Sequence, residues 1–363
     1  MHPTLCHRAF SAFDSRAGHV CCVYRRFQQR KTYHSWAELN NSPEVQQLRS
    51  DLLAGNRNDG CQQCWREEDQ GFTSMRTSLS WPGDVQPGRL RSLVVDTGNA
   101  CNLACRTCSA TDSSQHMIES RHRWPLQPVI DQRRGSNWSQ LQALDFTDLA
   151  IIEVIGGEPL LNLDHLALLQ TVIQQGHAHH VDVIYVTNCT NPLSATTAHI
   201  LRQFRSAKFN LSIDAVGRQF EYVRTGGQWP RVEATLNSIR QQLGDDHITV
   251  NPVVSALTVL CLDDLMTWCQ HQDLPVIHMN MAYQPACYSM QLFTESEREQ
   301  IIHYLQASVW AEKYQGIIRE IAACIGSPQA RADFDREVAW TEQYWGLALR
   351  DYLPALCGLI GAP

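Results

Sequence analysis

Three cysteines close together in the sequence could hold a metal centre. Cys101, Cys105 and Cys108 have the spacing C-x3-C-x2-C. A structural zinc or an ordinary electron-transfer cluster takes four protein ligands. A four-iron cluster with three protein ligands instead keeps one iron open for a small molecule. The three thiolates therefore favour a reactive iron–sulfur cluster, and a zinc loop completed by a distant His or Cys is the alternative.

A glycine-rich turn lies farther along the chain. Residues 150–155 have the pattern of a buried strand, which ends in Gly156-Gly157-Glu158-Pro159. Glycine lets a backbone approach a ligand closely, and proline removes a donor and stops a strand. Together, the cysteine loop and this turn resemble the radical S-adenosylmethionine (SAM) superfamily. In that family the cysteine loop follows the first barrel strand, and the turn follows the second and holds the amino group of SAM.

The resemblance implies a mechanism and its cofactors. Cys101, Cys105 and Cys108 would hold three irons of a [4Fe-4S] cluster, whose fourth iron would chelate SAM. An electron from a reductant such as flavodoxin or ferredoxin would cleave SAM to a 5′-deoxyadenosyl radical, which takes a hydrogen atom from the substrate. The cofactor-binding residues would be Gly156, Gly157, Glu158, Pro159, Asn188, Ser212, Asp214 and Arg224. For Asp214 and Arg224, simple pairing as surface charges is the alternative.

Strand and helix patterns alternate from residue 90 onward. Short Val- and Ile-rich runs predict strands at 90–96, 150–155, 181–187, 209–214, 248–254 and 276–281. Helical patterns lie near 109–121, 163–176, 194–206, 230–243 and 262–272, and 122–146 is interpreted as an inserted loop. This alternation predicts an α/β fold with a parallel sheet, and the resemblance implies a partial (β/α)6 barrel. The candidate site residues follow strands, where sites of parallel barrels lie.

The N-terminal region carries a second set of cysteines. Cys61 and Cys64 form a C-x2-C pair, Cys6 could add a third thiolate, and Cys21 or Cys22 a fourth. We favour Cys21 of the last two. Four thiolates make a closed site that suits zinc or an iron–sulfur cluster.

A further resemblance covers this region. The run 36–44, the Cys61–Cys64 pair and Ser74-Met75-Arg76 are similar to the N-terminal extension of twitch-domain radical SAM proteins. Twitch and SPASM modules hold an auxiliary iron–sulfur cluster. The resemblance therefore favours such a cluster here over zinc, and it could accept an electron from the substrate radical or shape the substrate pocket.

Two further cysteines could act on the substrate. Cys189 and Cys287 are candidate catalytic hydrogen-atom donors, although each could simply be a small buried hydrophobic residue. Cys189 also stands where the family commonly has glycine. The remaining thiols are interpreted as core residues: Cys261, Cys269, Cys324 and Cys357.

The chain is predicted to divide into three parts. A cysteine-rich module spans 1–88, the barrel spans 89–290, and a helical segment spans 291–363 with helices at 295–315 and 328–353. In the last helix Trp340, Tyr344, Trp345 and Leu349 are interpreted as an apolar face packed on the barrel.

The composition of the chain argues against two classes of binding partner, nucleic acids and membranes. The net charge of −7 argues against nucleic acid, and no apolar run is long enough to span a membrane. The 14 cysteines, in a chain whose N-terminus lacks the apolar core of a signal peptide, indicate a reducing, cytoplasmic setting.

The resemblance implies a radical SAM enzyme that acts on a peptide, a sugar or another small metabolite. It leaves open whether this enzyme is an oxidoreductase, an epimerase or a transferase. An RNA-modifying enzyme of the same chemistry and a non-catalytic metal-binding scaffold are the alternatives.

Overall fold

A computed structural model describes residues 4–15, 19–20, 33, 35–69, 71, 74–78, 86–123, 135–245 and 247–361. Cys21 and Cys22 lie outside the described residues. No helix among the described residues combines the length and apolar character needed to cross a membrane.

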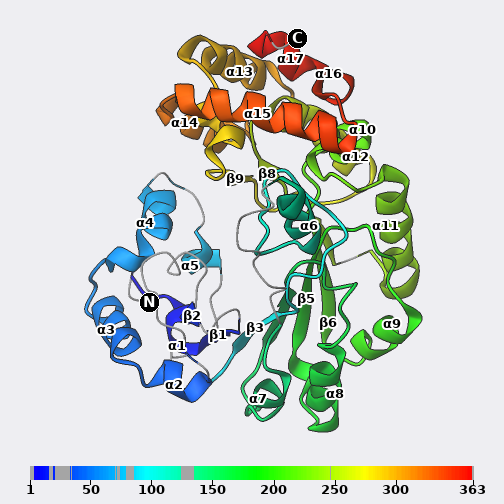
Figure 1. The fold of residues 1–363 in the computed structure, drawn as a ribbon. Helices are drawn as coiled ribbons and strands as arrows, with labels where there is room; N and C mark the ends of the chain where they lie inside the picture. The colour runs from blue at the N-terminus through cyan, green and yellow to red at the C-terminus, as the bar shows by residue number, and fades with distance from the viewer. Residues whose placement is uncertain are drawn as a thin grey trace. The chain divides into compact units, whose positions relative to one another are not determined.

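The described strands form one large sheet and one small one (Figure 1). The seven strands of the large sheet follow the order β2-β1-β3-β4-β5-β6-β7. Its central strands are parallel: β3 pairs with β4, β4 with β5, and β6 with β7. The strands are β1 (Ala12–Asp14), β2 (His19–Val20), β3 (Ser92–Asp96), β4 (Ile151–Ile155), β5 (Asp182–Thr187), β6 (Ser206–Leu211) and β7 (Ile248–Val250). The predicted α/β fold is confirmed, with the neighbour order expected of a partial (β/α)6 barrel.

The last two predicted strands are interrupted. The run predicted at 248–254 divides into β7 and β8 (Val253–Val254), because Pro252 has no N–H for a sheet ladder. The run predicted at 276–281 gives a single bridge from Val276 to Val250 and then β9 (Asn280–Met281), which pairs with β8. The strand predicted at 209–214 corresponds to β6, which begins and ends three residues earlier in the sequence.

Helices follow the strands, as expected for parallel connections. The Ser194 hydroxyl accepts a hydrogen bond from the Thr197 N–H and caps the start of α9 (Ala195–Leu201), whereas α11 (Trp229–Leu243) is followed by Gly244, whose φ is +87°. These helices are α6 (Ser114–Arg123), α8 (Leu166–Gln174), α9 (Ala195–Leu201), α10 (Gly217–Val223), α11 (Trp229–Leu243) and α12 (Leu262–His271). The region interpreted as an inserted loop contains a short helix, α7 (Trp138–Gln142).

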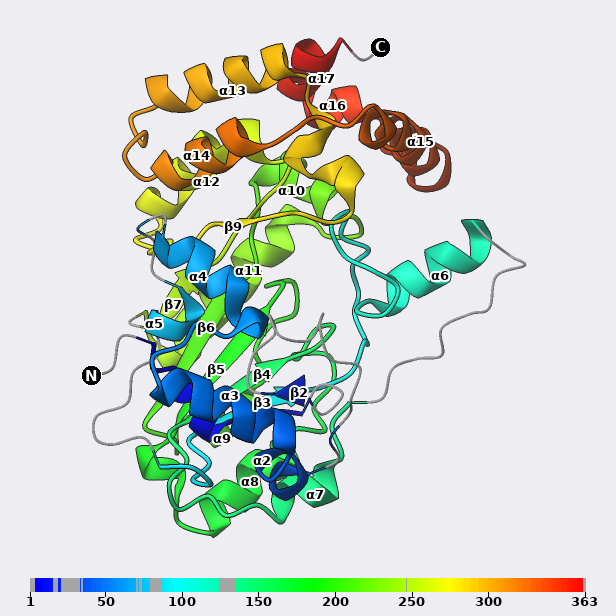
Figure 2. The same cartoon turned by 90° about the vertical axis from the view of Figure 1, so that its left-hand side faces the viewer.

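The C-terminal segment is helical, with more breaks than predicted (Figure 2). The helix predicted at 295–315 ends at Ala307, and the helix predicted at 328–353 ends at Trp345, because Gly346 adopts a left-handed conformation with φ +68°. The helices are α13 (Glu295–Ala307), α14 (Gln315–Ala323), α15 (Pro328–Trp345), α16 (Leu349–Tyr352) and α17 (Pro354–Ile360).

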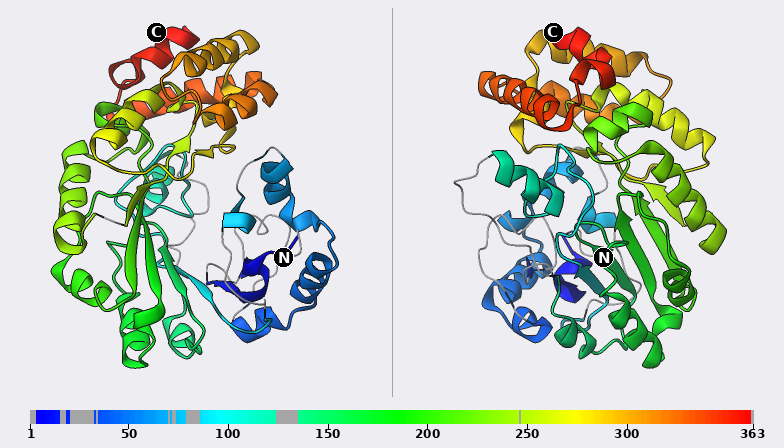
Figure 3. Two further views of the ribbon diagram at one scale, coloured as in Figure 1. Left: turned by 180° about the vertical axis from the view of Figure 1, so that it is seen from behind. Right: turned by 45° about the vertical axis from the view of Figure 1, so that its right-hand side comes forward.

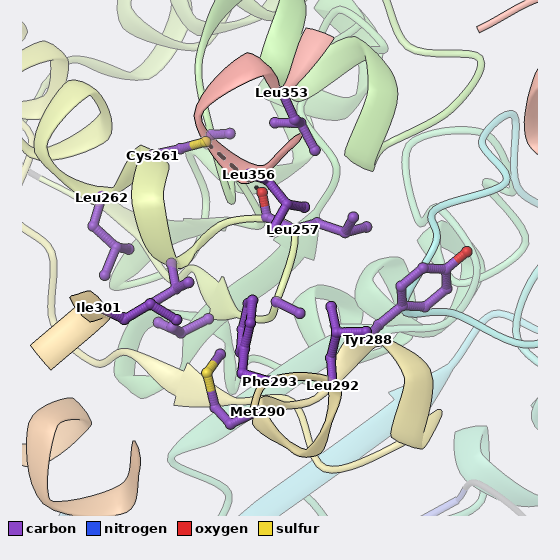
Figure 4. Close-up of a cluster of buried hydrophobic side chains, with 14 of the residues drawn as sticks. Leu257, Cys261, Leu262, Tyr288, Met290, Leu292, Phe293, Ile301, Leu353 and Leu356 are labelled. Carbon is purple, nitrogen blue, oxygen red and sulfur yellow. Dashed lines mark hydrogen bonds between the residues drawn. The ribbon is translucent and has the colours of Figure 1, made fainter. Parts of the chain in front are cut away.

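These C-terminal helices contribute to a buried apolar cluster. Leu257 and Leu262 meet Phe293, Ile301 and side chains of α17 (Figure 4). Burial of this apolar surface supplies the main favourable free energy for the packing.

The N-terminal segment contains short helices: α1 (His7–Ser11), α2 (Trp36–Asn40), α3 (Pro43–Leu53), α4 (Gln62–Asp69) and α5 (Met75–Ser78). Its strand β1 pairs in parallel with β3, from Ala12 opposite Ser92 to Asp14 opposite Val94. The sequence did not predict that this segment adds a strand to the sheet.

The chain divides into two compact units, each assembled from separate stretches. The first comprises Met1–Asn99, Arg133–Tyr185 and Ser194–Lys208, and the second Ala100–Gln132, Val186–Leu193 and Phe209–Pro363. The residue numbers of these stretches can be followed by colour in the two views of Figure 3. The division predicted at residues 88 and 290 stays a prediction.

Candidate functional site

Residues after β3 form the stem of the cysteine loop. The Thr97 N–H and hydroxyl both donate to the Ile155 carbonyl of β4, at 2.9 and 3.1 Å. The Asn162 amide donates to the Thr97 carbonyl at 2.7 Å, and the Gly157 N–H donates to the Gly98 carbonyl at 2.6 Å. The glycine turn after β4 is thus bonded to the chain that leads directly to Cys101.

The glycine turn needs glycine for steric reasons. Gly156 has φ +147°, and a Cβ there would lie 2.3 Å from the Thr97 hydroxyl and 2.8 Å from the Gly98 carbonyl oxygen. Glu158 is fully buried and accepts the Leu160 N–H at 3.0 Å. The turn is therefore packed closely against the chain that leads to Cys101.

The cysteine loop itself lies in the second unit and is held by backbone bonds. Ala104 N–H donates to Thr225 O, and Arg106 N–H donates to Val223 O, each at 2.8 Å. The His116 ring bonds the Cys105 carbonyl at 2.6 Å, and since a carbonyl only accepts, Nε2 carries the proton. The segment 104–106 is thus paired antiparallel to 223–225.

Nitrogen donors point at two of the three thiols. Asn188 Nδ2 lies 3.8 Å from Cys101 Sγ, and Arg224 Nη1 lies 3.8 Å from Cys105 Sγ. Burial raises the pKa of Cys105 and Cys108, and for Cys105 the Arg224 charge opposes this. The charges of Cys105 and Cys101 act on Cys108 as well, so the thiols are within electrostatic reach of one another.

An iron–sulfur cluster needs cysteine thiolates as its ligands. In the described part of the chain, no three His, Cys, Asp or Glu side chains are grouped as a finished metal site. The donor set nevertheless fits, because three thiols share one loop and N–H groups already face two of the sulfurs. Burial favours the protonated form of these thiols, and a bound metal would displace the protons.

Asp214 and Arg224 form a buried ion pair. Arg224 Nε lies 2.9 Å from Asp214 Oδ2, and Val253 N–H donates to Asp214 Oδ1 at 2.8 Å. Burial disfavours the charge of Arg224, but Asp214 outweighs it and raises the arginine pKa. The two residues pair, as the alternative interpretation proposed, but in the interior rather than on the surface. The neighbouring Ser212 is half-buried, and its N–H donates to Thr187 O at 2.8 Å.

The two candidate hydrogen-atom donors are both buried. Cys189 has φ +59°, a left-handed conformation that explains why glycine suits this position, and its Sγ lies 3.7 Å from Val232 O. Burial raises the pKa of Cys287 to about 11. Of the thiols interpreted as core, Cys261, Cys269 and Cys357 are buried and Cys324 is half-buried.

Among the described N-terminal thiols, Cys64 lies on α4, Cys61 ends the short 3-10 helix just before α4, and Cys6 precedes α1. Cys6 and Cys64 are buried, and Cys61 is half-buried. Burial raises the pKa of Cys6, and so does the charge of Cys64, which places these two thiols within electrostatic reach. Arg76 joins their elements, because it donates to the Leu5 carbonyl at 2.8 Å and pairs with Glu68 of α4.

Sequence reasoning missed the groups that support the cysteine loop. Arg106 pairs with Glu119, and Asn162 holds the stem at Thr97. The position of Arg106 between Cys105 and Cys108 was an available signal, because an arginine in a buried loop needs a carboxylate.

No protein-family model and no curated protein matches the chain. Among solved structures, it is similar to anSMEcpe with bound AdoMet, at 15% identity and a TM-score of 0.42, over 65% of this chain and 63% of that chain. It is also similar to Streptococcus suis SuiB bound to S-adenosylmethionine, at 12% identity and 0.38, over 70% and 59%. The match to SuiB with precursor peptide SuiA has 11% identity and a TM-score of 0.37, over 73% and 63%. The chain thus spans less than two thirds of each of these structures.

Proposed function

We propose that this chain is a radical SAM enzyme. Cys101, Cys105 and Cys108 would hold a [4Fe-4S] cluster, and the turn at 156–159 would bind SAM. The observation that carries the proposal is a three-thiol loop whose stem is hydrogen-bonded to the glycine turn, through Gly157 N–H and Gly98 O. When bound, the cluster and SAM would supply a 5′-deoxyadenosyl radical that takes a hydrogen atom from the substrate.

The residues of the chain would orient these groups and exclude water. Asn188 and Arg224 direct N–H groups at the sulfurs of Cys101 and Cys105, which stabilises negative charge there. Asp214 holds Arg224 in place. Cys101 and the Asp214–Arg224 pair are buried, which would help to keep bulk water from this part of the loop and protect a reactive radical. We assign Ser212 and Glu158 to the SAM site as further binding groups.

We further propose an auxiliary iron–sulfur cluster on Cys6, Cys61, Cys64 and either Cys21 or Cys22. The contacts of Arg76, which join the Cys6 segment to α4, support a shared site for the described thiols. Such a cluster could accept an electron from the substrate radical. Cys189 and Cys287 stay predictions as hydrogen-atom donors.

Formation of 5′-deoxyadenosine tests the proposal. Anaerobically reconstituted, dithionite-reduced protein should form this product from SAM, as measured by chromatography with mass spectrometry. Replacing Cys101, Cys105 and Cys108 together by Ala should abolish it, whereas Cys324→Ala, a half-buried thiol outside the site, should not. Equal product from the triple variant would contradict the assignment.

A further inference from the structure

A buried ion pair lies beside the cysteine loop. Arg106 Nη2 and Glu119 Oε2 are 3.0 Å apart, and their side chains are only 2% and 5% exposed. Arg106 also donates to Ala104 O at 2.7 Å and to Thr341 Oγ1 of α15 at 3.1 Å. Removing either residue would leave a buried charge without its counter-charge, which would strongly destabilise the folded protein.

Two indoles complete the surroundings of Glu119. Trp340 Nε1 donates to Oε1 at 2.7 Å, and Trp345 Nε1 donates to Oε2 at 3.2 Å. The carboxylate thus accepts bonds from α15 and from the cysteine loop at once. Burial raises the pKa of Glu119, but Arg106 outweighs it, and the net shift is downward. Trp340 and Trp345 are therefore more than the apolar face that the sequence suggested.

The pairing of the loop determines where Cys105 points. Ala104 and Arg106, the residues on either side of Cys105, both donate N–H groups to the segment 223–225. The Arg106 side chain contacts Glu119, whereas Cys105 Sγ lies 3.8 Å from Arg224 Nη1. Holding Arg106 therefore fixes the backbone next to Cys105 and, with it, the orientation of the thiol.

We propose that Glu119, bound by Trp340 and Trp345, is a positioning residue for the cluster loop and that its charge sets the cluster's reduction potential by neutralising Arg106. The inference rests on the proposed function, since it requires the cluster. Reduction adds an electron to the cluster. An uncompensated positive charge one residue from Cys105 would favour the reduced form, and an uncompensated negative charge would disfavour it.

Charge variants test the electrostatic part. Glu119→Gln should shift the midpoint potential upward, Arg106→Gln should shift it downward, and the double variant should return it close to the wild-type value. The potential is measured by a redox titration monitored by electron paramagnetic resonance, in proteins that also lack Cys61 and Cys64, so that only the barrel cluster is followed. A purely structural role would give no shifts of opposite sign. If Glu119→Gln does not fold, the downward shift of the midpoint potential in Arg106→Gln still tests the proposal.

Indole variants test the positioning part. Trp340→Phe combined with Trp345→Phe should release cluster iron to a chelator several-fold faster. Trp268→Phe is the matched control, because its buried indole N–H has no hydrogen-bond partner among the described residues. Unchanged potentials in folded, cluster-containing charge variants, or equal iron release from both indole variants, would overturn the inference. Absence of iron and sulfide from the parent protein would instead refute the proposed function.

Discussion

At the scale of single residues, Gly156 in the candidate site leaves no room for a side chain. Gly156 brings the turn after β4 against Thr97 and Gly98, and its φ of +147° is one that side chains rarely permit. A methyl group there would both strain the backbone and collide with its neighbours.

Gly156→Ala should therefore destabilise the protein by about 3 kcal/mol or more, from strain and overpacking together. Gly176→Ala is the matched control: Gly176 also has a positive φ, +81°, but nothing described lies within 4 Å of its Cβ position. Its cost should be about 1 kcal/mol, from strain alone. Denaturant unfolding compares the two, and equal losses would show that the turn does not pack closely against the stem.

At the scale of elements, a buried histidine joins the stem region to the sheet. His165 precedes α8 and is fully buried. Its Nδ1 lies 2.9 Å from Asn162 O, and because a carbonyl only accepts, Nδ1 carries the proton and Nε2 accepts the Tyr185 hydroxyl at 2.6 Å. Burial lowers the pKa of His165 to about 4.

This pKa predicts a pH-dependent stability. Between pH 4 and the ordinary histidine value the unfolded chain binds the proton that the folded chain excludes, so stability falls as pH decreases. From about pH 6.5 to 5 the loss should be about 1.5 kcal/mol. His165→Gln should flatten this dependence in unfolding experiments, whereas His199→Gln, at an exposed position of α9, should leave it unchanged. A profile with the same slope in His165→Gln would contradict the explanation.

The elements show what the sequence could and could not predict. Val- and Ile-rich runs between turn residues predicted β3, β4 and β5 within one or two residues, because such runs suit buried parallel strands. Pro252 was a signal in the sequence that the strand predicted at 248–254 is interrupted, but the prediction did not take it into account. The three-residue strand β1 is too short to show a periodicity, and its partner lies far along the chain.

In the candidate site, too, local features could be predicted and long-range contacts could not. The spacing of Cys101, Cys105 and Cys108 and the glycine turn are local in sequence and could be recognised directly. The contact of Glu119 with Trp340 joins residues 221 positions apart, and no local pattern predicts such a pairing.

At the scale of the whole molecule, the chain carries two sets of cysteines, for which we propose different roles. The barrel loop offers three thiols, which suits a cluster open to SAM, and the N-terminal set offers four, which suits a closed site. In the N-terminal segment, β1 extends the sheet by only three residues and the helices are short. A bound metal would therefore contribute directly to the folding of this segment.

The identity of that metal can be determined without the barrel cluster. In the variant lacking Cys101, Cys105 and Cys108, iron and sulfide should remain, together with visible charge-transfer absorption. Additional replacement of Cys61 and Cys64 by Ala should remove both, because a site with two thiolates fewer cannot hold a cluster. Elemental and sulfide analysis of the two variants measures this. One equivalent of zinc without sulfide in the first variant would make the N-terminal site structural. The barrel chemistry would survive that result, but the electron-acceptor role would not, since zinc has no accessible second oxidation state.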